Sequence, residues 1–332
     1  MTPAELSRTV LRAVRRAVDD GELGAAVADG VAAGTARIVV ERPRPGGHGD
    51  YATNVALQLA GPAGRPPRQV AEILSRRLVE APGIASVDVT GPGFLNLTLS
   101  SGTAGPGPDP DSHDSLRGHR IDLCVPHELR AATVAEALAR IGRDQGADVR
   151  VTYAEHPADV TFRPVPARPQ NLVELLGPDA ARWAMLHPAP HDHPRTATPE
   201  DRAAHLAQRA SNPLFRVRYA HARSRALTRN AADLGFTGAP GVVPGGEALA
   251  AALGDHPRIL LAAARHRAPD RLARHLVDVA DLFLTDLHPT VLPLGEEKPS
   301  AAHRARLALA EATGTVLAGG LTLLGIDAPE YL

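Results

Sequence analysis

Two stretches rich in proline and glycine divide the chain and limit what it can fold into. Residues 101–117 consist mainly of Gly, Pro, Asp and Ser, and residues 188–200 are again rich in proline. Both residue types interrupt helices and strands, so we expect linkers at 101–118 and 188–200. The sequence therefore predicts three folded segments, at 1–100, 119–187 and 201–332.

The first segment has the pattern of an α+β domain. Apolar residues recur at helical spacing over 3–33 and again after Pro67. Strand patterns at 84–89 and 94–99 are joined by a Gly-Pro-Gly turn, which is typical of a hairpin. These elements predict a compact unit of roughly one hundred residues.

The other two segments differ in class. The middle segment predicts a strand at 120–125, a helix at 128–142 and a strand at 148–153, which is one βαβ-like unit. A single unit of this kind is too small to bind a nucleotide by itself, so we interpret 119–187 as a truncated α/β remnant. From Asp201 onward the pattern is helical, with one helix expected over 202–233, and predicts an all-α C-terminal bundle.

Charge is unevenly distributed along the chain. The formal net charge is −1 over 332 residues, so there is no global footprint of a nucleic-acid-binding protein. Residues 202–229 nevertheless contain seven arginines and no Asp or Glu. On one helix, every seventh residue drifts only ~20° around the axis, which would align four of these arginines. The stripe is Arg202, Arg209, Arg216 and Arg223, with Arg218 and Arg225 as a second row. It can hold phosphates, or it can be an ordinary solvated helix face. Pro213 lies between Arg209 and Arg216 and can interrupt the helix and split the stripe.

Two runs in the first segment carry a resemblance to a known family. His48–Ala56 and Gly91–Asn96 resemble the additional N-terminal domain of arginyl-tRNA synthetases. The resemblance implies contact with the elbow of tRNA at the D loop, with Phe94 supplying a ring and Asn96 an amide. A ring can stack on an unpaired base while an amide reads the edge of that base. The alternative is that Phe94 belongs to the core and Asn96 is a strand-end hydrogen-bonding residue.

The last third resembles the DALR-type anticodon-binding bundle of the same family. The matching runs are 211–223, 272–280 and 321–330, and residues 177–183 resemble the segment that leads into that bundle. The resemblance implies that RNA-binding residues lie on the first long helix. The candidates are Arg209, Arg216, Arg218, Tyr219, His221, Arg223 and Arg225. Tyr219 and His221 can stack on loop bases or hydrogen-bond with them, and can equally be half-buried packing residues.

The middle segment departs from the family. Leu129-Arg130 and 137–140 keep the family's spacing, but Val125 and Glu128 occupy the positions of its histidine pair, and His127 occupies the position of its glycine. A carboxylate at 128 repels a triphosphate. The several hundred residues of catalytic domain expected after this helix are absent, and the chain has one lysine, Lys298. We therefore expect no catalytic residues, no cofactor and no aminoacylation.

The remaining chemistry-bearing residues suggest little. Cys124 is the only cysteine and is expected to be a buried structural thiol. His187, His191, His193 and Asp192 can be imagined around a metal ion, but a polar linker is the favoured interpretation and no metal is expected. No apolar run approaches the ~18 residues of a membrane span, so a cytoplasmic protein is expected.

The sequence thus supports two hypotheses of different class. The first is a noncatalytic tRNA-binding protein, with an arginine-type tRNA as the suspected partner, bound by the elbow-reading and anticodon-reading domains. The alternative is a protein-interaction or regulatory module of synthetase origin that does not bind RNA. The oligomeric state is left open.

Overall fold

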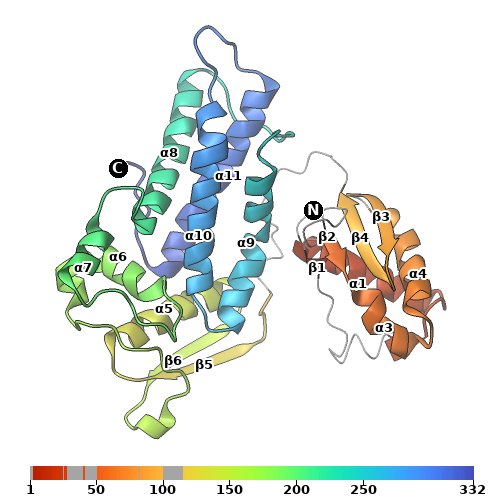
Figure 1. The fold of residues 1–332 in the computed structure, drawn as a ribbon, viewed down its shortest axis with the longest axis horizontal. Coiled ribbons are helices and arrows are strands. Elements are labelled where there is room, and N and C mark those ends of the chain that lie inside the picture. Colours follow the sequence, from red (N-terminus) through yellow and green to blue (C-terminus); the bar gives the residue numbers. More distant parts are fainter. Residues whose placement is uncertain (1–2, 25, 28–39, 42–50, 82, 100–114) are drawn as a thin grey trace. The chain divides into compact units, whose positions relative to one another are not determined.

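The chain forms two compact units, divided between Thr103 and Ala104 (Figure 1). The computed structural model describes residues 3–24, 26–27, 40–41, 51–81, 83–99 and 115–332. Each unit has an apolar core of its own. Residues 48–50, which begin the matching run His48–Ala56, and most of the predicted linker at 101–118 lie outside the described residues.

The first unit is an α+β domain, as the sequence predicted. Its sheet has the strand order β1-β2-β4-β3, and all neighbouring strands are antiparallel. Its elements, in chain order, are α1 (Pro3–Asp19), β1 (Val40–Glu41), β2 (Tyr51–Thr53), α3 (Val55–Ala63), α4 (Pro67–Val79), β3 (Ile84–Thr90) and β4 (Phe94–Leu99).

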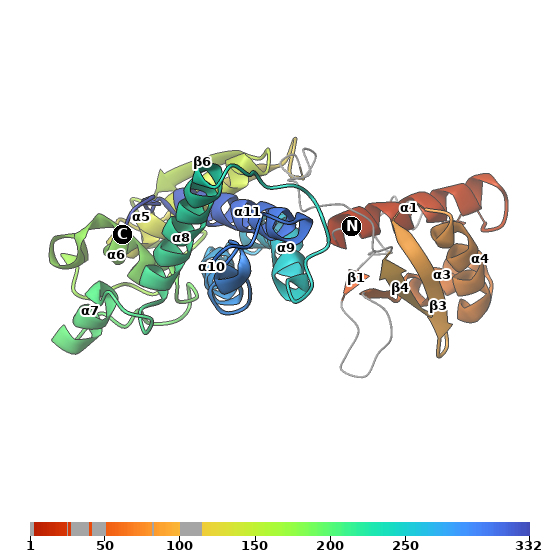
Figure 2. The ribbon, with the colours of Figure 1, turned by 90° about the horizontal axis from the view of Figure 1, so that it is seen from above.

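The two faces of this sheet have different environments. Figure 2 shows α1, α3 and α4 gathered on one side of the strands. Leu95 and Leu97 of β4 point into that layer and are fully buried. Side chains alternate between faces along a strand, so Phe94 and Asn96 stand on the opposite face, which no described helix covers.

The turn between β3 and β4 lies tightly against the start of α4. Gly93 has a φ of +146°, and a Cβ atom there would lie 2.9 Å from the carbonyl oxygen of Pro67. Glycine is the one residue that accepts both this backbone conformation and this close approach. The turn therefore holds the first residue of β4, Phe94, near the N-terminal end of α4.

The second unit joins a small parallel sheet to a helical bundle. Its two strands, β5 (Arg120–Val125) and β6 (Asp148–Tyr153), are parallel and flank α5 (Leu129–Asp144). The helices that follow are α6 (Leu172–Leu186), α7 (Pro199–Leu206), α8 (Pro213–Asp233), α9 (Glu247–Arg265), α10 (Asp270–Leu282) and α11 (Ala301–Leu324). Short helical turns are η2 (Pro157–Asp159), η3 (Phe283–Leu287, a π-helix) and η4 (His288–Thr290).

The predicted boundary between 119–187 and 201–332 is not present. One apolar cluster runs from Leu116 through the β5–α5–β6 segment to Ile326 and includes residues of α8 to α11. The α/β segment is therefore one wall of the bundle core, and not a spacer between domains.

The helix predicted over 202–233 is interrupted. α7 ends at Leu206 and α8 begins at Pro213. Asn212 caps α8 by accepting a hydrogen bond from the Leu214 amide (3.1 Å), and its Nδ2 donates to the carbonyls of His205 and Ala207 (2.9 Å each). Proline is favoured at the first position of a helix and disfavoured in its interior, so a helix start at Pro213 agrees with local chemistry.

One helix exceeds the apolarity expected from the sequence. α11 has 24 residues and contains an 18-residue window with a mean hydropathy of 1.5, so by length and composition alone it could cross a membrane. Half of its apolar window (50%) is buried. It packs against α8 and α10, as the central helix of a bundle does.

Candidate nucleic-acid interface

The open face of the first unit presents one aromatic ring. Phe94 is 42% exposed, so its ring is available to a ligand. Asn96 is only 8% exposed, and its Nδ2 donates to Oγ1 of Thr90 at 3.0 Å. The exposed Asp88 lies directly across the ladder from Asn96. Of the two predicted elbow-reading residues, Phe94 is therefore positioned for stacking, whereas the amide of Asn96 already serves the strand.

The arginines of α8 lie beside acids that come from distant parts of the chain. Arg216 pairs with Asp281 of α10 at 3.3 Å. Arg218 pairs with Asp179 of α6 and also donates to the carbonyl of Asp327 at 3.0 Å. Although residues 202–229 contain no Asp or Glu, the folded chain places acids from other segments beside these arginines.

The second half of α8 is paired in the same way. Arg225 and Arg229 lie 3.1 Å and 3.7 Å from the two carboxylate oxygens of Glu330. The guanidinium of Arg229 also stands over the ring of Tyr331, 4.3 Å from its centre. Arg223 donates to Nε2 of His288 at 2.9 Å. The chain that follows α11 thus covers the second predicted row of arginines.

The predicted stripe of four arginines is also broken in space. Arg202, in α7, donates to the carbonyls of Thr196 and Ala197 (3.1 and 2.8 Å). Arg209 lies in the loop between α7 and α8 and is exposed. It forms no ion pair with any of the described residues. The stripe was wrong as a geometric prediction, because the helix that would have aligned it ends at Leu206.

The two predicted ring contacts on α8 have different outcomes. Tyr219 is 38% exposed and stacks on Phe215, with 5.7 Å between ring centres. His221 is 4% exposed, and its Nδ1 lies 3.0 Å from the carbonyl oxygen of Pro329. Burial lowers the pKa of His221, which keeps the ring neutral. His221 is a packing residue, which corrects the suggestion that it can reach an RNA base.

The start of α5 is the place where the family's nucleotide-binding histidines are expected. Glu128 is the N-cap residue, and its carboxylate accepts hydrogen bonds from the amides of Arg130 (3.1 Å) and Ala131 (2.9 Å). The ring of His127 stacks on Tyr153, with 4.9 Å between centres. The helix N-terminus, which can bind a phosphate, is therefore already occupied by the protein's own carboxylate.

The β5–β6 sheet has one solvated face. Ladder partners on that face are Arg120 with Asp148, Asp122 with Arg150, and Cys124 with Thr152. Parallel sheets in α/β domains are usually buried on both faces and are apolar throughout. Here polar side chains alternate with apolar ones and lie on the outer face of the sheet. The two strands therefore need no further layer of helices over that face. Cys124 is half-buried on this face, which corrects the expectation of a buried thiol.

Arg130 organises the chain between α6 and α7. Its side chain is fully buried, and its guanidinium donates to five backbone carbonyls. Nε bonds to Met185 (3.0 Å), Nη1 to Val165 and Asp192 (2.7 Å each), and Nη2 to Pro188 (3.2 Å) and Ala189 (2.8 Å). Residues 188–192 are therefore anchored to the bundle, so the predicted linker at 188–200 is a fixed loop over that stretch. From the sequence, Arg130 stood out only as a family match.

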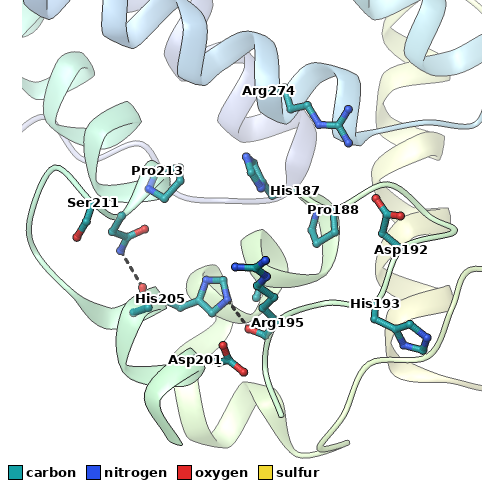
Figure 3. A pocket seen from close by; sticks show the side chains of 13 residues that line it. His187, Pro188, Asp192, His193, Arg195, Asp201, His205, Ser211, Pro213 and Arg274 are labelled. Atoms are coloured by element: carbon teal, nitrogen blue, oxygen red, sulfur yellow. Dashed lines mark hydrogen bonds between the residues drawn. The ribbon is translucent and has the colours of Figure 1, made fainter. Parts of the chain in front are cut away.

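This loop forms one wall of a hollow of about 740 Å³ (Figure 3). His187, Arg195 and His205 line it, and Arg274 reaches it from α10. His205 is held by a 3.0 Å contact between its Nε2 and the carbonyl of Arg195. Burial and nearby cations lower the pKa of His187. Across the described parts of the chain, no three His, Cys, Asp or Glu side chains gather closely enough to hold a metal ion.

Two family profiles match the chain. The profile of the arginyl tRNA synthetase N terminal domain matches residues 6–99, and that of the DALR anticodon binding domain matches residues 217–332. The first match covers the sheet that bears Phe94, and the second covers most of α8 and all of α9 to α11. The resemblance drawn from the sequence is confirmed.

Similar proteins are arginine–tRNA ligases. That of Micrococcus luteus is 42% identical over 172 residues, which is 46% of this chain and 30% of the ligase. That of Kineococcus radiotolerans is 43% identical over 171 residues, again 46% and 30%. The chain thus spans about a third of these relatives. The ligase of Pseudarthrobacter chlorophenolicus aligns with all of both chains at 25% identity, over 568 positions against 332 residues.

The fold is also that of known structures. Arginyl-tRNA synthetase from Thermus thermophilus matches with a TM-score of 0.66 at 15% identity, covering 100% of both chains. The synthetase from Plasmodium falciparum matches with a TM-score of 0.60 at 9% identity, covering 99% of both. At these identities the likeness is one of fold alone.

Proposed function

Because the chain belongs to the arginyl-tRNA synthetase family through its N-terminal and anticodon-binding domains, we propose that it binds tRNA without aminoacylating it. One observation carries the proposal. Both of the family's RNA-reading domains are present. The α/β segment between them has only two strands, with a polar outer face, and the N-terminus of its helix is capped by the carboxylate of Glu128. The suspected tRNA is of the arginine type.

Equilibrium binding of unfractionated tRNA to the full chain tests the first half of the proposal. Phosphate contacts release counterions, so affinity is greatest at low salt, and we expect saturable binding at ~50 mM salt that weakens as salt is raised. A gel-shift titration without ATP or arginine measures it. Absence of saturable binding at ~50 mM salt would contradict the proposal.

The second half predicts that no aminoacyl adenylate forms. Adenylate formation needs donors or cations placed around the reacting phosphate. At the start of α5 the Glu128 carboxylate takes the two amides that could serve. We expect no exchange of labelled pyrophosphate into ATP above a protein-free blank. The assay must contain arginine and tRNA, and a tRNA-dependent signal above the protein-free blank would show residual catalysis.

Replacing Phe94 with alanine is expected to weaken tRNA binding about tenfold. Stacking of a base on an aromatic ring contributes about 1–3 kcal/mol, and the exposed ring of Phe94 contributes little to the core. The loss should be larger for an intact tRNA than for an isolated anticodon stem-loop, because the elbow is missing from the fragment. Titration of both RNAs with wild type and variant measures this difference.

Tyr153→Ala is the matched control for this substitution, since Tyr153 is 41% exposed and lies in the other unit. The control should bind both RNAs as wild type does. Equal losses on tRNA and stem-loop in Phe94→Ala would count against an elbow contact. Unchanged thermal melting of unit 1 in the variant keeps the comparison interpretable.

A protein-interaction module is the second candidate, and one observation favours it. Arg216, Arg218 and Arg225 are paired with Asp281, Asp179 and Glu330, so α8 offers phosphates less free charge than its sequence suggests. Affinity capture from lysate, with and without RNase, separates the two functions. Partners that persist after RNase, together with no recovered tRNA, would favour the interaction module.

A further inference from the structure

The arginines of α4 and of the loop before it fall into two groups, those that form ion pairs with acids in the described part of the chain and those that do not. On α4, Arg68 pairs with Glu72 one turn away at 3.4 Å. Arg77 pairs with Asp20 at 2.6 Å and with Glu22 at 2.9 Å. The charges of these two arginines are already compensated, so they have little left to offer an anionic ligand.

Arg65 and Arg76 are different. Both are exposed, and among the residues that the structure describes neither has an acid within ion-pair distance. Both line one shallow hollow of about 600 Å³, which Gln69, Ser75 and Val89 complete. Glu72 also lines the hollow, but Arg68 compensates its charge. The hollow is therefore locally positive, although the whole chain has a net charge of −1.

The hollow follows an edge of the sheet. β3 is the last strand in the order β1-β2-β4-β3, so its outer side is not paired with another strand of that sheet. α4 runs beside it in the opposite direction: Ser75, near the end of α4, donates to the carbonyl of Val87 at 3.2 Å, and Pro67, at its start, lies against Gly93. Arg76 thus stands near the middle of β3, and Arg65 near the turn that leads to Phe94.

We propose that Arg65 and Arg76 bind two phosphates of one RNA strand that runs along the β3 edge toward Phe94. Arg76 lies nine residues after Pro67, about 14 Å along α4 at a rise of ~1.5 Å each, and Arg65 precedes that first helical residue by two, so the two arginines stand too far apart for one phosphate and are suited to two. Arginines that contact phosphates fix the position of a strand, and a ring at its end stacks on an unpaired base. The inference rests on the proposed tRNA binding and places it in unit 1.

Other exposed cations of this unit lack this arrangement. Arg15 and Arg16 on α1 are exposed, but neither lines the hollow that Arg65 and Arg76 share. Arg65 and Arg76 are therefore the pair that the structure favours.

The test compares Arg65→Gln, Arg76→Gln and Arg68→Gln in the full chain. Unfractionated tRNA is titrated at salt concentrations from ~50 to ~200 mM. Each of the first two variants is expected to bind about five- to tenfold more weakly at ~50 mM salt, with the slope of log K against log salt reduced by about 1. Arg68→Gln, which alters an arginine already paired with Glu72, is expected to keep the wild-type affinity and slope.

Each outcome bears on the inference. Equal losses in all three variants would indicate a general field effect and overturn the site. Wild-type behaviour of Arg65→Gln and Arg76→Gln, with the wild type binding tRNA, would overturn the site and leave the proposed function standing. Failure of the wild type to bind tRNA would overturn both. Polyglutamate is added as a competitor at the same concentration of negative charge as the tRNA. If it displaces the tRNA, the hollow would be assigned to an acidic protein and the RNA site would be contradicted.

Discussion

Replacing Arg130 with methionine is expected to lower the free energy of unfolding of the second unit by about 3–5 kcal/mol, because five backbone carbonyls lose their donor at about 1 kcal/mol each. The guanidinium is fully buried and donates to five carbonyls between Val165 and Asp192. Without it these acceptors lose their donors in a largely dry environment, and each loss costs about 1 kcal/mol or more. Methionine keeps the length of the side chain but offers no donor.

Trp183 gives a direct measurement of this effect. It is the only tryptophan, it is 1% exposed, and it lies on α6 in the second unit, so its fluorescence during urea unfolding reports that unit alone. The control is Arg143→Met. Arg143 makes a single hydrogen bond to a carbonyl, that of Val149 at 2.9 Å, and its replacement should cost about 1 kcal/mol. Equal urea midpoints for the two variants would contradict the role assigned to Arg130.

Acidification from pH 6.5 to pH 4 is expected to cost the second unit about 3 kcal/mol through His275 alone. This residue is 7% exposed, and burial lowers its pKa from 6.5 to about 4. Its ring stacks on His256 with 5.3 Å between centres, Asp255 raises its pKa, and Arg258 lowers it. The opposing effect of Asp255 is smaller than the effect of burial.

The sign follows from proton uptake. Between pH 6.5 and about 4 the unfolded chain protonates this histidine while the folded chain does not, so stability falls as pH falls. His275→Phe, which keeps a flat ring against His256, should remove this part of the pH dependence. Exposed His193→Gln should leave it unchanged. Trp183 fluorescence in urea at several pH values measures the difference between variants.

Three partly desolvated acids act in the opposite direction. Burial raises the pKa values of Asp270, Asp278 and Glu311. As pH falls, the folded state therefore takes up these protons before the unfolded state does. These acids are present in both the wild type and the His275→Phe variant. The difference between the two pH profiles therefore reports His275 alone. A wild type and a His275→Phe variant with the same pH profile would contradict the predicted cost.

Local patterns were enough to predict much of the fold. The strands at 120–125 and 148–153 were found at their predicted bounds, and the Gly-Pro-Gly turn joins β3 to β4 as expected. These elements are set by side-chain alternation, helical spacing and turn residues close in sequence. The two domains that match the synthetase family were predicted because their matching runs are long and in family order.

The site was harder to predict because its partners are distant in sequence. Arg218 pairs with an acid 39 residues earlier, and Arg225 with one 105 residues later, so an acid-free segment did not produce an unpaired surface. Arg130 was missed as an anchor because its five acceptors are backbone carbonyls, which have no signature in sequence. Arg65 and Arg76 stand out only once the partners of Arg68 and Arg77 are known.

Crosslinking the protein to RNA in living cells, followed by sequencing of the attached RNA, tests the central claim most directly. We predict that tRNA dominates the recovered RNA, with arginine tRNAs enriched over their cellular abundance and crosslinks at the elbow reduced by Phe94→Ala. Recovery of RNA no different from that of a control protein that does not bind RNA would contradict the claim that this chain is a tRNA-binding protein.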